Sequence, residues 1–342
     1  MRACVVHGAG DLRVEDVAPA EPGPGQVAVD VAFGGICGSD LHYYHEGRVG
    51  DFLVSEPMVL GHEVAGRVAL AGEGAEAPPP GTPVAIHPAT PCDGCRECRE
   101  GHRNVCAGTR YLGSAAHVPH VQGGFAQRIV LPAGQVRPLP PGLSLRVAAL
   151  TEPLSVALNA VRRAGEVRGR RVLVTGAGPI GCLVVAALRP AGAAEIIVSD
   201  LVDEALALAR RVGATSTVRA GAGGPDHDAW PEAVDVAIEA SGAPAGLADC
   251  VRTVRRTGTV VMLGMLPPGD VVFPASLVIT REIRLVGSFR FDTEFDDALA
   301  LLAAGLDVEP VITHTVPLAE ARAAFDLAGD RTVASKILLD LG

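Results

Sequence analysis

A glycine-rich turn between a strand-like run and a helix-like run constrains the fold of this chain more than any other feature. The segment Gly176–Gly181 (GAGPIG) follows the β-branched run 171–175 and opens an apolar run with helical character. Glycines at these spacings permit a tight turn and let a pyrophosphate approach the amides at a helix N-terminus. The motif predicts a dinucleotide site in which the cofactor contacts Gly176, Gly178, Pro179, Ile180 and Gly181.

An acidic residue at the end of the next strand-like run bears on the choice of cofactor. Asp200 follows the glycine turn at the distance of about 20 residues that is typical of dinucleotide-binding units. A carboxylate there accepts a hydrogen bond from the ribose 2′-hydroxyl and repels a 2′-phosphate. The next residues, Leu201, Val202 and Asp203, include no arginine. The predicted cofactor is therefore NAD, with NADP as the alternative.

The pattern of strand-like and helix-like runs changes near Pro153. Strand-like and helix-like runs alternate from Ser155 to about residue 285, which is typical of a doubly wound parallel sheet with crossover helices. The preceding part is rich in glycine and proline turns. Its predicted strands lie at 27–33, 64–69, 84–86 and 126–130. The tail returns to mixed structure, with predicted strands at 311–316 and 336–341 and one helix face at Phe295, Leu299 and Leu302. The sequence predicts an α/β fold with a second, β-rich unit.

Four cysteines form the array C-x2-C-x2-C-x7-C, at Cys92, Cys95, Cys98 and Cys106. Four thiolates can surround one ion tetrahedrally, and zinc accepts this all-sulfur shell. A disulfide pair or four unrelated thiols is the alternative. Because a four-thiolate shell leaves no open position, the array predicts a structural zinc site and no chemistry.

Bulk properties exclude several partners. The chain has 342 residues, enough for two domains, and a formal net charge of −10 with no basic run, which argues against nucleic acid. No apolar run approaches the roughly 18–20 residues that cross a bilayer, and the N-terminus lacks a signal-peptide pattern. We expect no membrane partner and a cytoplasmic location, where reduced cysteines favour metal. Lys336 is the only lysine, and it suggests no function by itself.

A second metal site would need three protein ligands and a vacant position. Cys37 stands between glycines after a strand-like run, His62 and Glu63 follow Gly61, and Glu152 lies where the two units meet. Each has an ordinary alternative: a buried thiol, a hydrogen-bonded histidine or solvated carboxylates. Their occurrence beside a dinucleotide motif favours a metal-dependent oxidoreductase.

These motifs together resemble the zinc-dependent medium-chain dehydrogenases. The pattern G-H-E-x2-G-x5-G-x2-A begins at Gly61, CGSD-x-H begins at Cys37, and the cysteine array and glycine turn follow in order along the whole chain. The runs GGICGSDLHYYHEGRVGDF and FPASLVITREIRLVGSFRFDTEF are more specific. They resemble the polyol branch of that family and, within it, enzymes that oxidise the sugar acid L-idonate at carbon 5.

The resemblance implies a GroES-like catalytic domain built from both chain ends around a Rossmann domain. It implies bounds of 1–153 for the first part, with a structural zinc lobe at about 88–110, of 154–287 for the Rossmann domain, and of 288–342 for the C-terminal return. It implies that Cys37, His62 and Glu63 hold a catalytic zinc, and that Glu152 lies nearby and exchanges as a ligand.

Further roles follow from the same resemblance. Ser39 and His42 would relay the released proton to solvent, and Tyr43 would border the substrate, with simple packing as its alternative. A sugar acid needs a carboxylate partner, which suits the planar fork of an arginine. Arg290 is the first candidate, with a cofactor or sugar-hydroxyl contact as its alternative. Weaker candidates are His120, Arg110 and His117, and further expected cofactor contacts are Ser241, Gly264 and Arg290.

The expected function is reversible oxidation of a sugar acid to its 5-keto form with NAD. A sorbitol- or xylitol-type polyol dehydrogenase is the alternative enzyme. A catalytically silent nucleotide-binding protein is a third hypothesis, which the presence of Cys37, His62, Glu63 and the Ser39–His42 pair disfavours. By family resemblance the chain is expected to form a homodimer or homotetramer.

Overall fold

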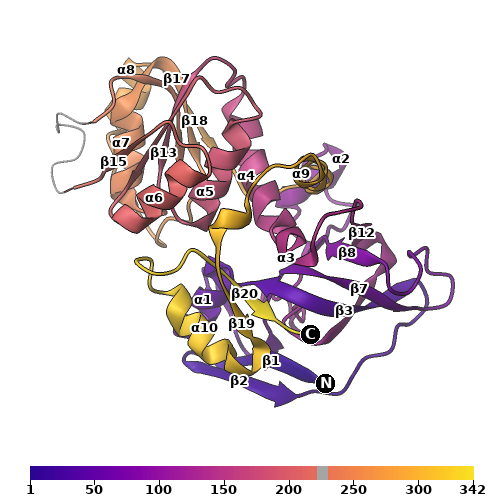
Figure 1. Cartoon of the computed structure of the whole chain (residues 1–342). Coiled ribbons are helices and arrows are strands. Elements are labelled where there is room, and N and C mark those ends of the chain that lie inside the picture. Colours follow the sequence, from indigo (N-terminus) through magenta and orange to yellow (C-terminus); the bar gives the residue numbers. More distant parts are fainter. Residues whose placement is uncertain (222–229) are drawn as a thin grey trace.

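Two sheets organise the molecule, which we describe from a computed structural model covering residues 1–221 and 230–342. A six-stranded parallel sheet and a seven-stranded, mainly antiparallel sheet occupy separate halves (Figure 1). Helix α4 (Thr151–Ala164) lies between them. The predicted combination of a doubly wound α/β unit and a β-rich unit is confirmed.

The parallel sheet has the strand order β15-β14-β13-β16-β17-β18. Its strands are β13 (Arg171–Thr175), β14 (Glu195–Asp200), β15 (Ser216–Arg219), β16 (Val234–Glu239), β17 (Val254–Met262) and β18 (Arg284–Gly287). The helices of this half are α5 (Pro179–Leu188), α6 (Asp203–Arg211), α7 (Pro244–Thr253) and α8 (Ala275–Thr280), and α9 (Glu294–Ala303) packs on the other side of α4. From β13 the chain adds strands first on one side and then, from β16, on the other. Sheets of this kind bind ligands at that switch point, beside β13.

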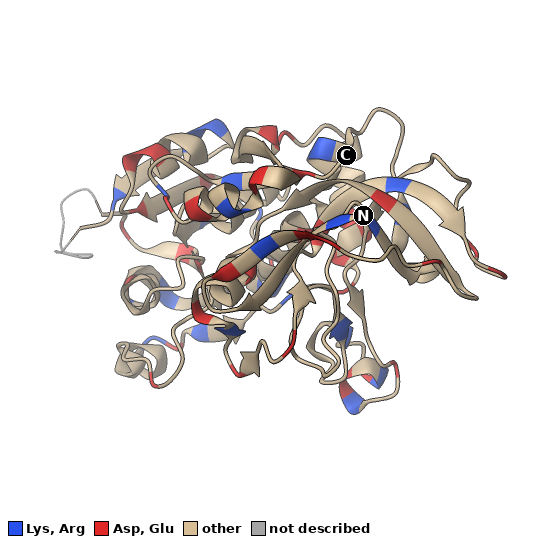
Figure 2. Ribbon diagram, turned by 90° about the horizontal axis from the view of Figure 1, so that it is seen from below, with Lys and Arg blue, Asp and Glu red and all other residues tan. Residues whose placement is uncertain are grey.

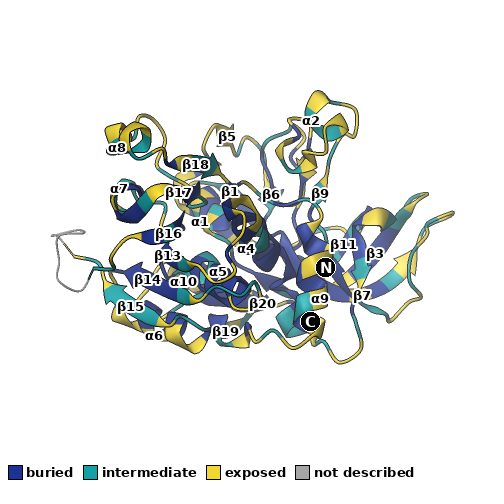
Figure 3. Ribbon diagram, turned by 90° about the horizontal axis from the view of Figure 1, so that it is seen from above, coloured by how far each residue is buried: buried dark blue, intermediate teal, exposed yellow. Residues whose placement is uncertain are grey.

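Both faces of the parallel sheet are buried. Val172 and Val174 of β13 pack in one core cluster with α4, α5 and α6, whereas Leu173 packs in another with α7. This alternation follows from the period of two along a strand. Figure 3 shows the buried strands at the centre of this half, with exposed residues on the outer helices.

The second sheet joins the two chain ends. Its order is β12-β8-β7-β3-β20-β19, with β11 also pairing with β3. The strands are β3 (Gln26–Gly35), β7 (Glu63–Ala71), β8 (Pro83–Ile86), β11 (Arg128–Pro132), β12 (Val136–Pro138), β19 (Ile312–Pro317) and β20 (Lys336–Asp340). Strand β20 from the C-terminal segment is antiparallel to β3, with Leu339 opposite Gly34 (Figure 1). The C-terminal segment therefore completes the β-rich half.

Shorter elements surround this sheet. The helices are α1 (Gly38–Glu46), α2 (Arg96–Arg99), α3 (Leu145–Ala148) and α10 (Ala321–Ala328). The strands are β1 (Arg2–Gly8), β2 (Asp11–Asp16), β4 (Arg48–Val49), β5 (Phe52–Leu53), β6 (Met58–Val59), β9 (Ala89–Thr90) and β10 (Arg110–Tyr111). Helix α2 projects from the body and carries exposed residues (Figure 3).

Helix α4 begins earlier than the sequence suggested. The helical pattern was expected from Ser155, but α4 starts at Thr151 and includes Pro153 in its first turn. Proline is tolerated there because the first amides of a helix have no intrahelical acceptor. The expected boundary between residues 153 and 154 therefore falls inside a continuous helix, and the three domain bounds stay a prediction.

Charges of both signs are spread over the whole ribbon (Figure 2). Among residues 1–221 and 230–342, no helix is both long and apolar enough to cross a membrane.

Candidate metal centres and cofactor cleft

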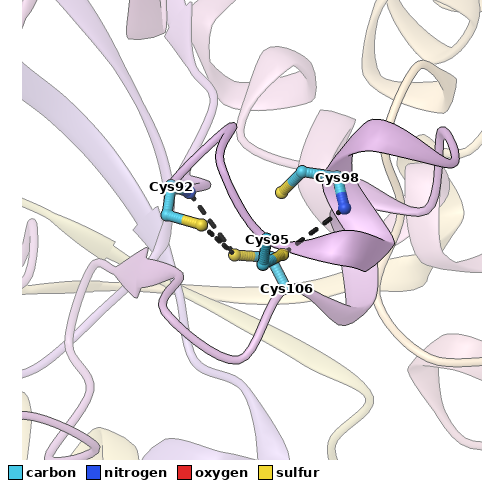
Figure 4. Close-up of side chains that lie close together, drawn as sticks. All are labelled: Cys92, Cys95, Cys98 and Cys106. Carbon is cyan, nitrogen blue, oxygen red and sulfur yellow. Dashed lines mark hydrogen bonds between the residues drawn. The ribbon is translucent and has the colours of Figure 1, made fainter.

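The four cysteines of the array come together in a lobe around α2. Their sulfur atoms lie within 4.8 Å of one another, and they point toward a common centre (Figure 4). The Sγ atoms of Cys92 and Cys106 are 3.5 Å apart. In a tetrahedral site with zinc–sulfur bonds of about 2.3 Å, sulfurs are separated by about 3.8 Å. The lobe therefore fits a four-thiolate zinc site.

Backbone amides support negative charge on these sulfurs. The amide of Cys92 donates to Cys106 Sγ at 3.4 Å, and the amide of Cys98 donates to Cys95 Sγ at the same distance. The bond from Cys92 lowers the pKa of the Cys106 thiol to about 6. Because zinc binds the thiolate form, this environment suits metal binding.

A second group of ligand atoms lies where two chain segments meet. Cys37 follows β3 and precedes α1, whereas His62 and Glu63 lie at the start of β7. One ligand atom from each of the three residues lies within 4.8 Å of the other two. Gly35 makes this approach possible, because a Cβ there would collide with the Glu63 carboxylate. The predicted ligands of the catalytic zinc are thus neighbours in space.

Two further charged residues hold this group. The Asp40 carboxylate accepts hydrogen bonds from the amides of Cys37 at 2.9 Å and Gly61 at 3.2 Å, and it lies 3.9 Å from His62 Nδ1. The buried Lys336 Nζ contacts both Glu63 oxygens at 2.7 Å. Neither role was predicted, because the CGSD motif assigns no contact to Asp40 and Lys336 is distant from this group in the sequence.

The charges of the group match a bound cation. Burial lowers the pKa of His62, but the nearby charges of Cys37 and Asp40 outweigh burial and raise this pKa to about 10. Burial raises the pKa of Glu63 to about 7, against the pull of Lys336. Zinc would supply positive charge to this buried anionic group, and thiolate, imidazole and carboxylate are all zinc ligands. The donor set therefore fits the predicted metal.

Glu152 lies beside this group but is held by a tyrosine. Tyr111 Oη donates to Glu152 Oε1 at 2.6 Å, and the Tyr111 ring is edge-on to His62 with centroids 5.6 Å apart. Burial, followed by the Glu152 charge, raises the pKa of Tyr111 well above its usual value, so the phenol keeps its proton. The Arg290 guanidinium stacks 4.4 Å from the centre of the same ring. Sequence reasoning missed Tyr111, since a single tyrosine carries no motif.

The expected relay residues lie on α1. His42 is exposed, lines the cleft described below, and approaches Glu46 Oε1 with its Nδ1 at 2.8 Å. Ser39 is half-buried one turn earlier. Tyr43 is buried, and its hydroxyl accepts a hydrogen bond from the Ala115 amide at 3.0 Å.

A cleft of about 680 Å³ lies between the two halves. Cys37, His42 and Glu63 line it from the β-rich half. The glycine turn lines it from the parallel sheet, through Gly178, Pro179 and Ile180. Gly178 is the N-cap of α5 and faces open space, whereas a Cβ at Gly181 would collide with the carbonyl of Gly176. The glycines thus serve the two purposes expected of them, room for a ligand and a close turn.

Three comparisons with known proteins agree with this geometry. The family model "Alcohol dehydrogenase GroES-like domain" matches residues 23–141, and the model "Zinc-binding dehydrogenase" matches residues 179–304. The L-idonate 5-dehydrogenase (NAD(P)(+)) of Escherichia coli is 40% identical over 99% of this chain and 98% of its own. The chain belongs to the zinc-dependent medium-chain dehydrogenases.

Solved structures show the same relationship. The crystal structure of L-idonate 5-dehydrogenase from Escherichia coli matches with a TM-score of 0.93 and 39% identity, over 99% of this chain and 97% of that one. A zinc-binding dehydrogenase from Sinorhizobium meliloti bound to NADP matches with a TM-score of 0.90 and 32% identity, over 99% and 98%. A sorbitol dehydrogenase of Bacillus subtilis is 33% identical over 96% of this chain and 93% of its own.

The adenosine side of the cleft in this medium-chain dehydrogenase differs from expectation. Asp200 ends β14 as predicted, and its Oδ2 accepts a hydrogen bond from the Ala177 amide at 2.6 Å. The same oxygen also lies 2.6 Å from the guanidinium of Arg331, in the C-terminal segment. The sequence showed no arginine next to Asp200 because this one is 131 positions away.

Two further expectations for this dehydrogenase find limited support in the structure. Both ring nitrogens of His120 are used inside the protein, Nε2 by the Ser55 amide at 3.0 Å and Nδ1 by the His117 carbonyl at 2.7 Å. His120 is also buried, so its substrate role has no support in these contacts and stays a prediction. Of the expected cofactor contacts, Ser241 lines the cleft, whereas Gly264 and Arg290 lie outside its lining, Gly264 bonded to the Glu239 carbonyl at 2.9 Å.

Proposed function

We propose that this medium-chain dehydrogenase oxidises L-idonate at carbon 5 to 5-dehydro-D-gluconate, reversibly and with NAD(P). The observation that carries the proposal is 40% identity over 99% of the chain to the Escherichia coli L-idonate 5-dehydrogenase. The Cys37, His62 and Glu63 group at the cofactor cleft supports it. A sorbitol- or xylitol-type polyol dehydrogenase is the alternative, favoured by the similarity to sorbitol dehydrogenases.

In this proposal, Cys37, His62 and Glu63 hold the catalytic zinc and leave a fourth position open. Zinc bound there would act as a Lewis acid that lowers the pKa of the substrate hydroxyl. Glu152 would stay beside the metal, hydrogen-bonded to Tyr111. The lobe cysteines Cys92, Cys95, Cys98 and Cys106 would hold the structural zinc.

The chain's own residues would move the released proton. Ser39 and His42 are three residues apart on α1, so their side chains share one helix face. His42 lies at the cleft and contacts Glu46 near the surface. An imidazole can take a proton at one ring nitrogen and release one from the other, which suits a proton carrier between substrate and solvent.

Arg290 would bind the substrate carboxylate. Its guanidinium stacks on Tyr111 at 4.4 Å and on Phe289 at 4.7 Å, and Tyr111 contacts Glu152. This position is on the metal side of the site. The backbone supports the proposal too, since Arg290 has φ of 51°, an unfavourable conformation for a non-glycine residue that is often retained at functional sites. Tyr43 would border the same substrate pocket.

The substrate is tested by initial rates with the zinc-loaded protein on L-idonate, D-gluconate, sorbitol and xylitol. We expect kcat/KM for L-idonate to exceed that for the polyols at least tenfold, or about 1.4 kcal/mol. A preference for a polyol would contradict the sugar-acid assignment and leave the polyol alternative. Arg290→Ala should raise KM for L-idonate far more than for sorbitol, while Arg13→Ala, at an exposed arginine paired with Asp11, serves as the control. Equal effects of Arg290→Ala on both substrates would remove its carboxylate role.

We further propose a cytoplasmic homodimer or homotetramer. Strand β18 is an edge of the parallel sheet, and Phe289, two residues beyond it, is exposed. Such an edge suits pairing across a two-fold axis. A thiolate zinc lobe suits a reducing compartment. Light scattering on the purified protein tests the oligomer, and a monomer at micromolar concentration would contradict it.

A further inference from the structure

Arg331 brings a positive charge to the adenosine side of the cofactor cleft. It follows α10 in the C-terminal segment, which belongs to the β-rich half, and both Arg331 and the neighbouring Thr332 line the cleft. Its guanidinium nitrogen lies 2.6 Å from Asp200 Oδ2, at the end of β14 in the parallel sheet. A residue from one half therefore contacts the carboxylate that is expected to bind the ribose in the other half.

We propose that Arg331 is the residue that binds the 2′-phosphate when this dehydrogenase takes NADP in place of NAD. The inference rests on the proposed dinucleotide function. It revises the expectation of NAD preference, which was based on the residues directly after Asp200.

The hydrogen-bonding capacity of the pair supports this role. Asp200 Oδ2 accepts from Ala177 and Arg331, whereas Oδ1 accepts from the Val202 amide at 3.0 Å. Oδ1 has one further lone pair for a ribose hydroxyl, which must approach a side chain that is only 2% exposed. A guanidinium has five N–H donors, and within the described residues Arg331 makes one hydrogen bond, to Asp200. Its side chain is 47% exposed, so further donors can reach a ligand in the cleft.

The charge of the pair supports it as well. Asp200 alone would repel a 2′-phosphate, but paired with Arg331 it contributes a net charge near zero. Glu204 and Arg211 of α6 also line the cleft, and their opposite charges offset one another. Arginine binds phosphate through two parallel hydrogen bonds, a geometry that its planar fork favours. The site can thus take either a ribose diol or a ribose phosphate.

The simpler alternative is that Arg331 only ties the two halves together. Loss of a purely structural contact would change the affinities for NAD and NADP by similar factors, because the two cofactors differ only in the 2′-phosphate. A phosphate partner would change NADP binding selectively. The ratio of the two dissociation constants therefore separates the two roles.

The experiment is isothermal titration of the zinc-loaded full chain with NAD⁺, NADP⁺, AMP and adenosine 2′,5′-bisphosphate. We expect Arg331→Ala to raise the ratio Kd(NADP⁺)/Kd(NAD⁺) at least tenfold and to leave Kd(NAD⁺) within about threefold. The two adenosine ligands, which lack the nicotinamide, should show the same selective change. Arg331→Lys should retain part of the NADP affinity, since it keeps the charge and loses the fork. The exposed Arg322→Ala, on α10 of the same segment, is the control and should leave the ratio unchanged.

An unchanged ratio in Arg331→Ala, or parallel weakening of both cofactors, would overturn the role of Arg331 and leave the proposed function intact. Failure of the unmodified protein to bind either dinucleotide would instead contradict the proposed function itself.

Discussion

The two metal centres of this enzyme are built in opposite ways. The four-cysteine lobe comes from one short segment, stands near the surface, and makes its contacts mainly within itself. The group of Cys37, His62 and Glu63 comes from two segments, and Lys336 reaches it from the far end of the chain. The comparison suggests that the lobe supports stability locally, whereas the second group couples chemistry to the packing of the whole β-rich half.

The largest effect is expected from removing a ligand of the second group. Cys37→Ser should lower kcat/KM by at least about 1,000-fold, because a Lewis-acid metal supplies several kcal/mol of transition-state stabilisation. Zinc content, measured by mass spectrometry, should fall from about two equivalents per chain to about one. Activity within tenfold of the unmodified enzyme, with both zinc equivalents retained, would show that Cys37 is not a ligand.

Lys336→Met should destabilise the protein strongly. The Lys336 ammonium is buried and holds both oxygens of the buried Glu63. Removing one partner of a buried pair leaves an uncompensated charge and costs about 3–5 kcal/mol of unfolding free energy. Urea unfolding of chelator-treated protein measures the loss without the metal. The double variant Lys336→Met/Glu63→Gln should be more stable than the single one, and equal stabilities would indicate that Lys336 acts by packing alone.

The residues of the two metal centres and of the cofactor cleft differ in how far the sequence alone could predict them. The glycine turn, Asp200, the cysteine array and the Cys37, His62 and Glu63 set could be found because each belongs to a local pattern with a chemical meaning. The parallel sheet was likewise predicted from the alternation of its runs.

The contacts of Lys336, Asp40, Tyr111 and Arg331 could not be found in this way. Each residue acts through a partner brought near by the fold, as Lys336 does with Glu63 across 273 positions. Helix α4 shows the same limit on a local scale, since the position of Pro153 marked a boundary in the sequence but lies inside the helix. The contacts of His120 were hidden for the same reason, because Ser55, which bonds its Nε2, is 65 positions away in the sequence.

Loss of a ligand from the cysteine lobe is expected to lower stability and spare catalysis, whereas loss of Cys37 is expected to lower catalysis. Cys98→Ser should remove about one zinc equivalent and lower the free energy of unfolding by more than about 2 kcal/mol, since loss of a structural metal is among the large destabilising changes. The specific activity of the folded fraction should stay within about threefold. Arg96→Ser, also on α2 and exposed, is the control and should change stability by less than about 0.5 kcal/mol. A loss of activity in Cys98→Ser that exceeds its loss of folded protein would mean that the lobe also shapes the active site.

The smallest effect is expected at Tyr111, which joins the second group to the substrate side. Tyr111→Phe removes the 2.6 Å hydrogen bond to Glu152 and keeps the ring on which Arg290 stacks. A hydrogen bond to a charged group contributes about 1.5–3 kcal/mol, part of which a bound water would replace. We therefore expect kcat/KM to fall about tenfold with zinc content unchanged. Tyr44→Phe loses a comparable hydrogen bond, to Asp326 at 3.2 Å, away from the metal, and should leave kcat/KM unchanged. If the two variants behaved alike, Glu152 would not need a fixed position for catalysis, and the second group would be as self-contained as the lobe.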